Sequence, residues 1–345
     1  MDLHILNGDC LREVFEKSGI RGDTHVLREM LLESPFELNC DWDDLFEMRA
    51  EWLQKQFGIP PDEYLAEKES EYELIDRLDR YDDVYFWFDP DLFCQLNLIY
   101  ALSWFTSEHA SGARLHLVRS GTSPDGRMQA LSRMTKADLR ERLQNSSRIQ
   151  PEHVDWADAF LIAYGADTPL PLWKSMRTDC PRLSSGLPDL RSAVDRLFRL
   201  YPSVTDGTGW TERLILDEIR TESETGMPTG IALRDLQRRI LSNPDAELSG
   251  MTDLLLYRHL RNFTLGAQPL VTVAGHDGLP DFTHPADPDD LAATRCSLTK
   301  EGRDVLAGRV DRLSIHPVDR WIGGVHLCPE TGYWRFDGEG FIRPV

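Results

Sequence analysis

The order of strand-like and helix-like segments in residues 1–127 constrains the fold of this chain more than any other feature. Short apolar or β-branched runs are each followed by a segment with helical periodicity. The expected strands are Leu3–Leu6, His25–Met30, Asp83–Phe88 and Ala113–Arg119, and the expected helices lie at 11–17, 41–57, 62–79 and 92–105. Strands that alternate with helices pair in parallel, with the helices on the sheet faces. We therefore predict an α/β fold with a mostly parallel sheet and flanking helices.

The rest of the chain has a different pattern. Residues 128–204 show only helical periodicity. Three helical segments, two strand segments and a last helix follow, at 210–221, 231–242, 250–263, 270–274, 294–298 and 298–308, and tail strands are expected at 321–327 and 333–337. Three helices and a two-stranded wing are typical of a winged-helix domain. We predict an α/β domain at 1–127, a helical region at 128–204, and a winged-helix-like domain with a β-rich tail at 205–345.

The acidic composition restricts the partners of the protein. The chain has 58 acidic and 38 basic residues, a formal net charge of −20, and residues 205–310 hold 17 acidic and 11 basic residues. Such a surface repels nucleic acids and anionic membranes. DNA reading would need a basic row on the helix at 250–263, for which the candidates are Arg258, His259, Arg261 and Asn262. The charge balance favours protein–protein packing for this region instead.

The sequence carries no signal for a membrane or an oxidising compartment. The longest apolar run, 96–105, is too short to span a bilayer, and the N-terminus lacks the basic segment of a signal peptide. The six cysteines are scattered without the close spacing of a metal site, so we expect reduced thiols and no structural zinc site, and we assign no residue as a metal ligand. We expect a cytoplasmic protein of bacterial type.

The first candidate site residues follow the first strand. Asn7, Gly8 and Asp9 form the turn into the next helix, and His4 precedes them on the strand. Gly8 lets a ligand approach the backbone, and the free N–H groups at the helix start can hold an anion such as phosphate. Asp9 can bind a ribose hydroxyl or a metal ion, or act as a base. In the alternative interpretation, Asp9 only caps the helix and His4 is a hydrogen-bonded core histidine.

A second group of polar residues surrounds the second expected strand. Gly22 and Asp23 precede this strand, while Arg28 and Glu29 lie near its end. Arg28 has the forked geometry that clamps a phosphate or carboxylate, and Glu29 can act as a general base or a metal ligand. Because neighbouring parallel strands end at one edge of a sheet, we expect both groups to meet there. The alternative is an exposed ion pair at a strand end.

Asp89 and Gln95 complete the candidate set. Asp89 directly follows the strongest strand pattern, 83–88, at a place where active-site acids often lie. We favour Asp89 instead as the N-cap of the following helix, with Pro90 as its first residue. Gln95 lies in an apolar helix, where it either satisfies neighbouring polar groups or faces the site.

Several of these motifs together resemble the DUF1835 domain family, a bacterial family of unknown function. The resemblance rests on Leu3-His4-Ile5-Leu6-Asn7-Gly8-Asp9, Gly22-Asp23, Arg28-Glu29, Asp89 with Gln95-Leu96, and Asp319-Arg320-Trp321-Ile322-Gly323-Gly324-Val325-His326-Leu327. It implies a helical C-terminal half with winged-helix-like elements and no established activity. One position departs from the pattern of the family, because Gly209 stands where the family has a serine before a helix. With Glu212 three residues later, we expect the helix to persist without its capping box.

These patterns predict the binding of a small anionic ligand, a nucleotide or a phosphorylated metabolite, at the strand ends. The ligand-binding candidates are His4, Asn7, Gly8, Asp23, Arg28, Asp89 and Gln95, and the catalytic candidates, for a hydrolysis or a transfer, are Asp9 and Glu29. The chain lacks GxSxG, HExxH, Walker and GxGxxG motifs, so the sequence selects neither a reaction nor a cofactor. The alternative is a non-enzymatic regulatory or interaction module that docks a protein, or reads DNA, through the winged-helix-like region.

Overall fold

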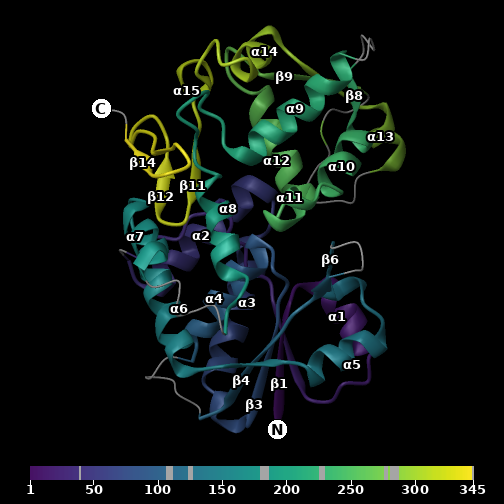
Figure 1. The fold of residues 1–345 in the computed structure, drawn as a ribbon, viewed down its shortest axis with the longest axis vertical. Helices are drawn as coiled ribbons and strands as arrows, with labels where there is room; N and C mark the ends of the chain where they lie inside the picture. Colours follow the sequence, from purple (N-terminus) through teal and green to yellow (C-terminus); the bar gives the residue numbers. More distant parts are fainter. Residues whose placement is uncertain are drawn as a thin grey trace. The chain divides into compact units, whose positions relative to one another are not determined.

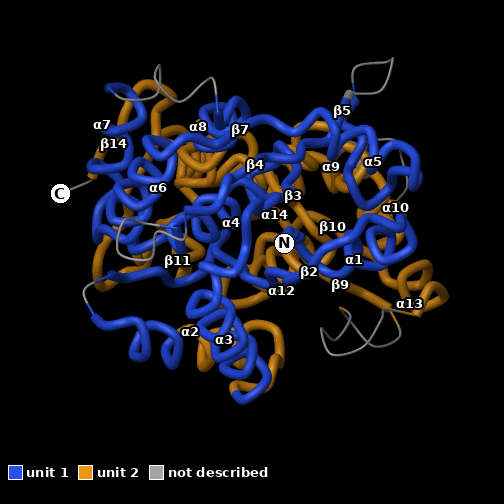
Figure 2. Tube along the Cα trace, turned by 90° about the horizontal axis from the view of Figure 1, so that it is seen from below, with its two compact units in different colours: residues 1–48, 62–194, 323–325 blue, residues 49–61, 195–322, 326–345 orange. Residues whose placement is uncertain are grey.

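The computed structural model has a mixed α/β fold with two compact units (Figure 1). It describes residues 1–38, 40–105, 112–122, 127–178, 186–224, 230–275, 279 and 287–343. Unit 1 comprises residues 1–48, 62–194 and 323–325, and unit 2 comprises residues 49–61, 195–322 and 326–345 (Figure 2). Most of the predicted helical region, 128–204, therefore belongs to the same unit as the N-terminal strands. No helix among the described residues is long and apolar enough to cross a membrane.

Unit 1 is built on a five-stranded sheet with the order β2-β1-β3-β4-β7. The strands are β1 (Asp2–Asn7), β2 (Asp23–Leu27), β3 (Asp83–Trp87), β4 (Arg114–Val118) and β7 (Ser147–Ile149). The first four are parallel, and only β7 runs antiparallel. The chain moves outward from β1 to β2, and then returns across β1 to β3 and β4. The direction of winding therefore reverses between β1 and β3, which makes this position a topological switch point.

Helices cover both faces of this sheet (Figure 1). Those of unit 1 and its borders are α1 (Asp9–Glu16), α2 (Trp42–Phe57), α3 (Pro61–Ile75), α4 (Leu92–Ser103), α5 (Lys136–Gln144), α6 (Pro151–Tyr164), α7 (Leu170–Thr178) and α8 (Leu190–Phe198). A core between α1, α5 and the sheet includes Leu6, Phe15, Trp87 and Leu139. On the other face, α4 packs against α6 and is buried along nearly its whole length, as its apolar sequence requires.

Unit 2 contains the helices and strands expected at 210–308, together with a short strand and three short helices that were not predicted, β8, α11, α13 and α15. Its elements include α9 (Trp210–Glu224), β8 (Ile231–Ala232), α10 (Leu233–Leu241), α11 (Pro244–Leu248), α12 (Asp253–Thr264), β9 (Val271–Ala274), α13 (Pro288–Ala293), β10 (Arg295–Leu298), α14 (Lys300–Leu306) and α15 (Arg312–Ile315). The antiparallel pair β9 and β10 confirms the two predicted strands. The third strand of their sheet, β8, was not predicted, because two residues carry no periodicity.

The tail differs from the prediction of one strand at 321–327. This segment forms two short strands, β11 (Arg320–Ile322) and β12 (Val325–Leu327), which pair with each other. Gly323 between them has φ +62°, a conformation that favours glycine and turns the chain. The last pair is β13 (Arg335–Phe336) with β14 (Phe341–Ile342).

The prediction of a basic, DNA-binding surface on α12 is wrong, because two of its four residues are buried. Arg258 and His259 are 3% and 2% exposed. Arg258 donates to Gln56 Oε1 at 3.1 Å and lies 5.2 Å from the centroid of the Trp52 ring. His259 Nδ1 lies 3.9 Å from Glu212 Oε1. These side chains stabilise the interior of unit 2 and do not form a surface for phosphates.

Glu212 on α9 is the centre of a buried ionic cluster in unit 2. Its carboxylate lies 2.5 Å from Arg312 Nη1 and 3.3 Å from Arg320 Nη1. It also accepts a hydrogen bond from the Gly209 N–H at 2.8 Å, so half of the capping box survives without the serine. Burial by itself would raise the pKa of Glu212, but Arg312, Arg320 and His259 lower it to about 2. The carboxylate is therefore ionised at neutral pH.

We expect Glu212→Gln to lower the free energy of unfolding by about 3–5 kcal/mol at pH 7, because two arginines would be left buried without a counter-charge. The folded-state pKa of about 2 lies below the ordinary 4.5, so this stabilisation is present above pH 4.5 and is lost as the pH falls towards 2. Urea denaturation at several pH values measures both effects. The control, Asp217→Asn, removes a partly exposed carboxylate from the same helix and should cost less than about 1 kcal/mol. Equal losses in the two variants would contradict the prediction.

Candidate functional site

The polar residues that follow β1 and β3 lie together at the carboxyl edge of the sheet. Leu6 pairs with Trp87 in the parallel register of β1 and β3. The next residues, Asn7-Gly8 and Phe88-Asp89, therefore leave the sheet side by side. In open α/β sheets, ligands bind outside the carboxyl ends of the strands where the winding reverses. The β1–β3 switch point is thus the candidate site of this protein.

The turn from β1 into α1 exposes a helix N-terminus. Gly8 is the N-cap residue, with φ 81° and ψ 164°, and no side chain caps α1. A Cβ at Gly8 would meet no described atom within 4 Å, so there is open space beside the backbone. The unpaired N–H groups and the helix dipole make such a terminus attractive to anions. The alternative role of Asp9 as the cap is wrong, because Asp9 is the first residue of the helix itself.

Asn7 connects the end of β1 to α4. Its Nδ2 donates to Cys94 Sγ at 2.9 Å, and its Oδ1 accepts from Asn97 Nδ2 at 2.9 Å. Asn97 Nδ2 also donates to the Glu29 carbonyl at 2.9 Å. The two asparagines therefore hold the ends of β1 and β2 against the first two turns of α4.

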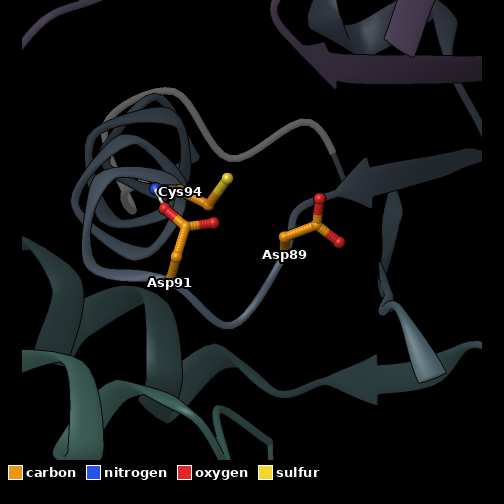
Figure 3. Close-up of side chains that lie close together, drawn as sticks. All are labelled: Asp89, Asp91 and Cys94. Atoms are coloured by element: carbon orange, nitrogen blue, oxygen red, sulfur yellow. Dashed lines mark hydrogen bonds between the residues drawn. The ribbon is translucent and has the colours of Figure 1, made fainter. Parts of the chain in front are cut away.

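Asp89, Asp91 and Cys94 form a cluster of potential metal ligands at the end of β3 (Figure 3). One ligand atom from each residue lies within 4.8 Å of the others. Cys94 comes from the first turn of α4, Asp91 is the N-cap residue directly before this helix, and Asp89 comes from the loop before it. The preferred prediction that Asp89 is the N-cap is wrong, because Asp91 caps α4 by accepting from the Cys94 N–H at 3.0 Å. Asp89 accepts instead from the Leu131 N–H, at 3.2 Å.

A bound cation would change the electrostatics of this cluster. Burial raises the pKa of Asp91, and burial together with the carboxylates of Asp91 and Asp89 raises the pKa of the Cys94 thiol well above its ordinary value. A cation between these groups would reverse both effects. Two carboxylates and a thiol suit Zn²⁺, while the carboxylates alone suit Mg²⁺ or Mn²⁺ with water or phosphate oxygens. The cysteine spacing predicted no metal site, and the acids considered as metal ligands were Asp9 and Glu29. The spacing Asp-x-Asp-x-x-Cys after a strong strand was the available signal.

Asp9 and Arg28 lie close together, as the parallel strands predict, but they form an ion pair with each other. Arg28 binds Asp9 through Nε at 2.7 Å and Nη2 at 2.9 Å, and its Nη1 donates to both oxygens of Glu67 at 2.8 Å. The hydrogen bond from Arg28 lowers the pKa of Asp9, so its carboxylate is a weak base. The fork of Arg28 already holds two carboxylates, which leaves little of it for an anionic ligand.

Glu29 lies in a buried ionic cluster with Lys68 and Glu71, and is neither exposed nor paired with Arg28. The three side chains are at most 4% exposed. Lys68 Nζ lies 2.6 Å from Glu29 and 2.8 Å from Glu71. Tyr64 and Tyr100 donate to the same two carboxylates, at 3.1 and 2.9 Å. Burial raises the pKa of Glu71, and the neighbouring carboxylates raise the pKa of Lys68 despite its burial. The sequence analysis missed Lys68, which lies within a run of acidic residues.

The remaining predicted residues, His4, Asp23 and Gln95, lie at three different places in unit 1. His4 is buried in the middle of β1, where Nδ1 accepts from Trp87 Nε1 at 3.1 Å and Nε2 bonds to the Arg21 carbonyl at 3.1 Å. This matches the alternative of a core histidine, and burial lowers its pKa. Asp23 begins β2 at the opposite edge of the sheet and accepts from the Tyr81 hydroxyl, so its prediction as part of the same pocket is wrong. Gln95 Nε2 donates to the Asp89 carbonyl at 2.8 Å, while its buried Oε1 has no described partner.

Comparison with known proteins gives no family. No protein-family model matches this chain, and no curated protein matches it. The resemblance to the DUF1835 domain family therefore stays a prediction.

We expect Lys68→Met to lower the free energy of unfolding by about 3–5 kcal/mol, because Glu29 and Glu71 would be left as two buried carboxylates without a cation. Glu71→Gln should cost less, since the raised pKa of Glu71 shows that its charge is poorly stabilised. Chemical denaturation of both variants, with the exposed Lys17→Met as the control, tests this order. If the Lys68→Met protein were as stable as the control, the buried ionic cluster would contribute nothing to the free energy of unfolding, and the prediction would be wrong.

Proposed function

We propose that the switch point between β1 and β3 binds a small phosphate-containing ligand, a nucleotide or a phosphorylated metabolite, together with a divalent cation. One observation carries the proposal: Asn7, directly before the uncapped N-terminus of α1, donates a hydrogen bond of 2.9 Å to Cys94 of the cluster with Asp89 and Asp91. The helix terminus attracts the anion, and the carboxylates attract the cation.

The helix terminus, which would hold the phosphate, and the carboxylates, which would hold the cation, depend on each other in this proposal. A phosphate group next to Asp89 and Asp91 would be repelled by their carboxylates unless a cation lay between them. A divalent ion held by one or two carboxylates and by phosphate oxygens is the usual arrangement for nucleotides. The open space beside Gly8 allows a phosphate to approach the backbone N–H groups of α1. Asn7 supports both halves, because it holds the end of β1 against Cys94.

In this proposal, Asp9 and Arg28 position the site and do not react with the ligand. Their bidentate ion pair fixes the first turn of α1 to the end of β2. Glu29 is excluded as a base, since Lys68 and Tyr64 hold its buried carboxylate. The acids that remain beside the site are Asp89 and Asp91. They are suited to holding a metal ion.

Calorimetric titration and thermal unfolding test the proposal, with ADP, ATP, inorganic phosphate and glucose 6-phosphate, each with and without Mg²⁺, Mn²⁺ or Zn²⁺. At about 100 times its dissociation constant, a ligand should stabilise the wild type by about 2.7 kcal/mol. We expect the effect only when both the phosphate compound and a cation are present. Asp89→Asn and Asp91→Asn should abolish it, and asparagine at position 91 still caps α4.

The control for these variants is Asp62→Asn, which removes an exposed carboxylate from the first turn of α3. It should bind like the wild type. The proposal is overturned if none of these compounds binds with any cation, or if Asp89→Asn and Asp91→Asn bind as tightly as Asp62→Asn.

A further inference from the structure

A cavity lies in unit 1, at the opposite end of α4 from the strand-end site. It has a volume of about 320 Å³, which is at the lower end of the range for small-molecule sites. Five aromatic side chains line it, contributed by α2, α3 and the C-terminal end of α4: Trp42, Phe46, Tyr72, Tyr100 and Trp104. One carboxylate, Asp76, lies beside them. We name this site the aromatic cavity.

The rings of the aromatic cavity pack against one another, and two of them are partly exposed to solvent. The ring centroids are 5.7 Å apart for Trp42 and Phe46, 6.0 Å for Phe46 and Tyr72, and 5.7 Å for Tyr100 and Trp104. Phe46, Tyr100 and Trp104 are buried, whereas Trp42 and Tyr72 are 41% and 42% exposed. Exposed aromatic side chains grouped at a cavity are typical of a surface that binds a ligand or a partner.

The charges around the aromatic cavity are acidic. Asp76 is exposed and has no ion-pair partner among the described residues. Partial burial raises the pKa of the Tyr72 hydroxyl, the carboxylates of Asp43, Glu71 and Asp41 raise it further, and Lys68 lowers it. Among the described residues, Lys68 Nζ lies over the Phe46 and Tyr100 rings, at 5.5 and 5.2 Å from their centroids, and its charge is balanced by Glu29 and Glu71.

The chemistry of the lining excludes most other classes of ligand. An anion would be repelled by the carboxylates at the opening. An inorganic cation needs several oxygen ligands, and the side chains that line the cavity offer only Asp76, Ser103 and two tyrosine hydroxyls, one of which is bonded to Glu71. A methylated ammonium group is weakly hydrated and is attracted by the faces of tryptophan and tyrosine. Such a group combines the charge and the apolar surface that this lining can accept.

We propose that the aromatic cavity binds an organic cation with a methylated or quaternary ammonium group, held by Trp42, Tyr72 and Trp104 and attracted by Asp76. The proposal is independent of the strand-end site, because the two sites share no residue and lie at opposite ends of α4.

Isothermal titration with choline, tetramethylammonium and 3,3-dimethylbutan-1-ol tests this proposal. The last compound has the shape of choline, with an uncharged carbon in place of the nitrogen. We expect choline to bind at least tenfold more tightly than the alcohol. Tyr72→Leu and Trp42→Leu should each weaken choline binding about tenfold, because each removes one ring face from the cation. Both residues are partly exposed, so the variants should fold.

The contribution of charge is tested with Asp76→Asn, which should weaken choline binding several-fold, and with its matched control. Asp79→Asn removes another exposed carboxylate three residues later, outside the cavity lining, and should leave binding unchanged. The proposal is overturned if the alcohol binds as tightly as choline, if neither cation binds at millimolar concentration, or if Tyr72→Leu and Asp76→Asn bind choline like Asp79→Asn.

Discussion

The parallel pairing of β1 with β3 is the constraint on which the rest of unit 1 depends. These strands are buried at the centre of the sheet, and a hydrogen bond between Trp87 and His4 joins their side chains. Their register determines that the turn after Asn7 and the loop after Trp87 leave the sheet together. Since β2 and β4 lie on opposite sides of this pair, no crossover helix covers the space between the two loops. A different strand order would separate the α1 terminus from the carboxylates after β3.

Buried ionic clusters are the second organising feature of this acidic protein. In unit 1, Lys68 joins Glu29 and Glu71, and in unit 2, Glu212 joins Arg312 and Arg320. A buried ion pair contributes little net stability compared with apolar packing, but the loss of one partner is costly. Each cluster therefore ties segments that are distant in the sequence to one arrangement. The cluster around Lys68 also supports the wall of the aromatic cavity, because Tyr100 contacts both.

The sequence predicted the fold better than it predicted the site. The alternation of strand and helix patterns gave the parallel sheet, and the helix at 41–57 lies within one residue of α2. Asn7, Gly8, Asp9 and Asp89 follow strands whose neighbours were foreseeable, so their position at the carboxyl edge was predictable. Asp23 was misassigned because strand limits shift by a few residues, and β2 begins where a loop was expected. The N-cap was misassigned for the same reason, since Asp89 and Asp91 are equally good caps in the sequence.

By itself the sequence determined the elements that local periodicity encodes: the buried strands, the amphipathic helices, and the polar residues that end them. Only the tertiary structure decided which of these polar residues meet. Arg28 is adjacent to Glu29 in the chain, but pairs with Asp9 and Glu67, whereas Glu29 pairs with Lys68. Successive residues at the end of a strand point in opposite directions, so their partners come from different elements. The aromatic cavity likewise depends on packing between three helices, which no local pattern records, whereas the metal-ligand cluster lies within one short segment, 89–94.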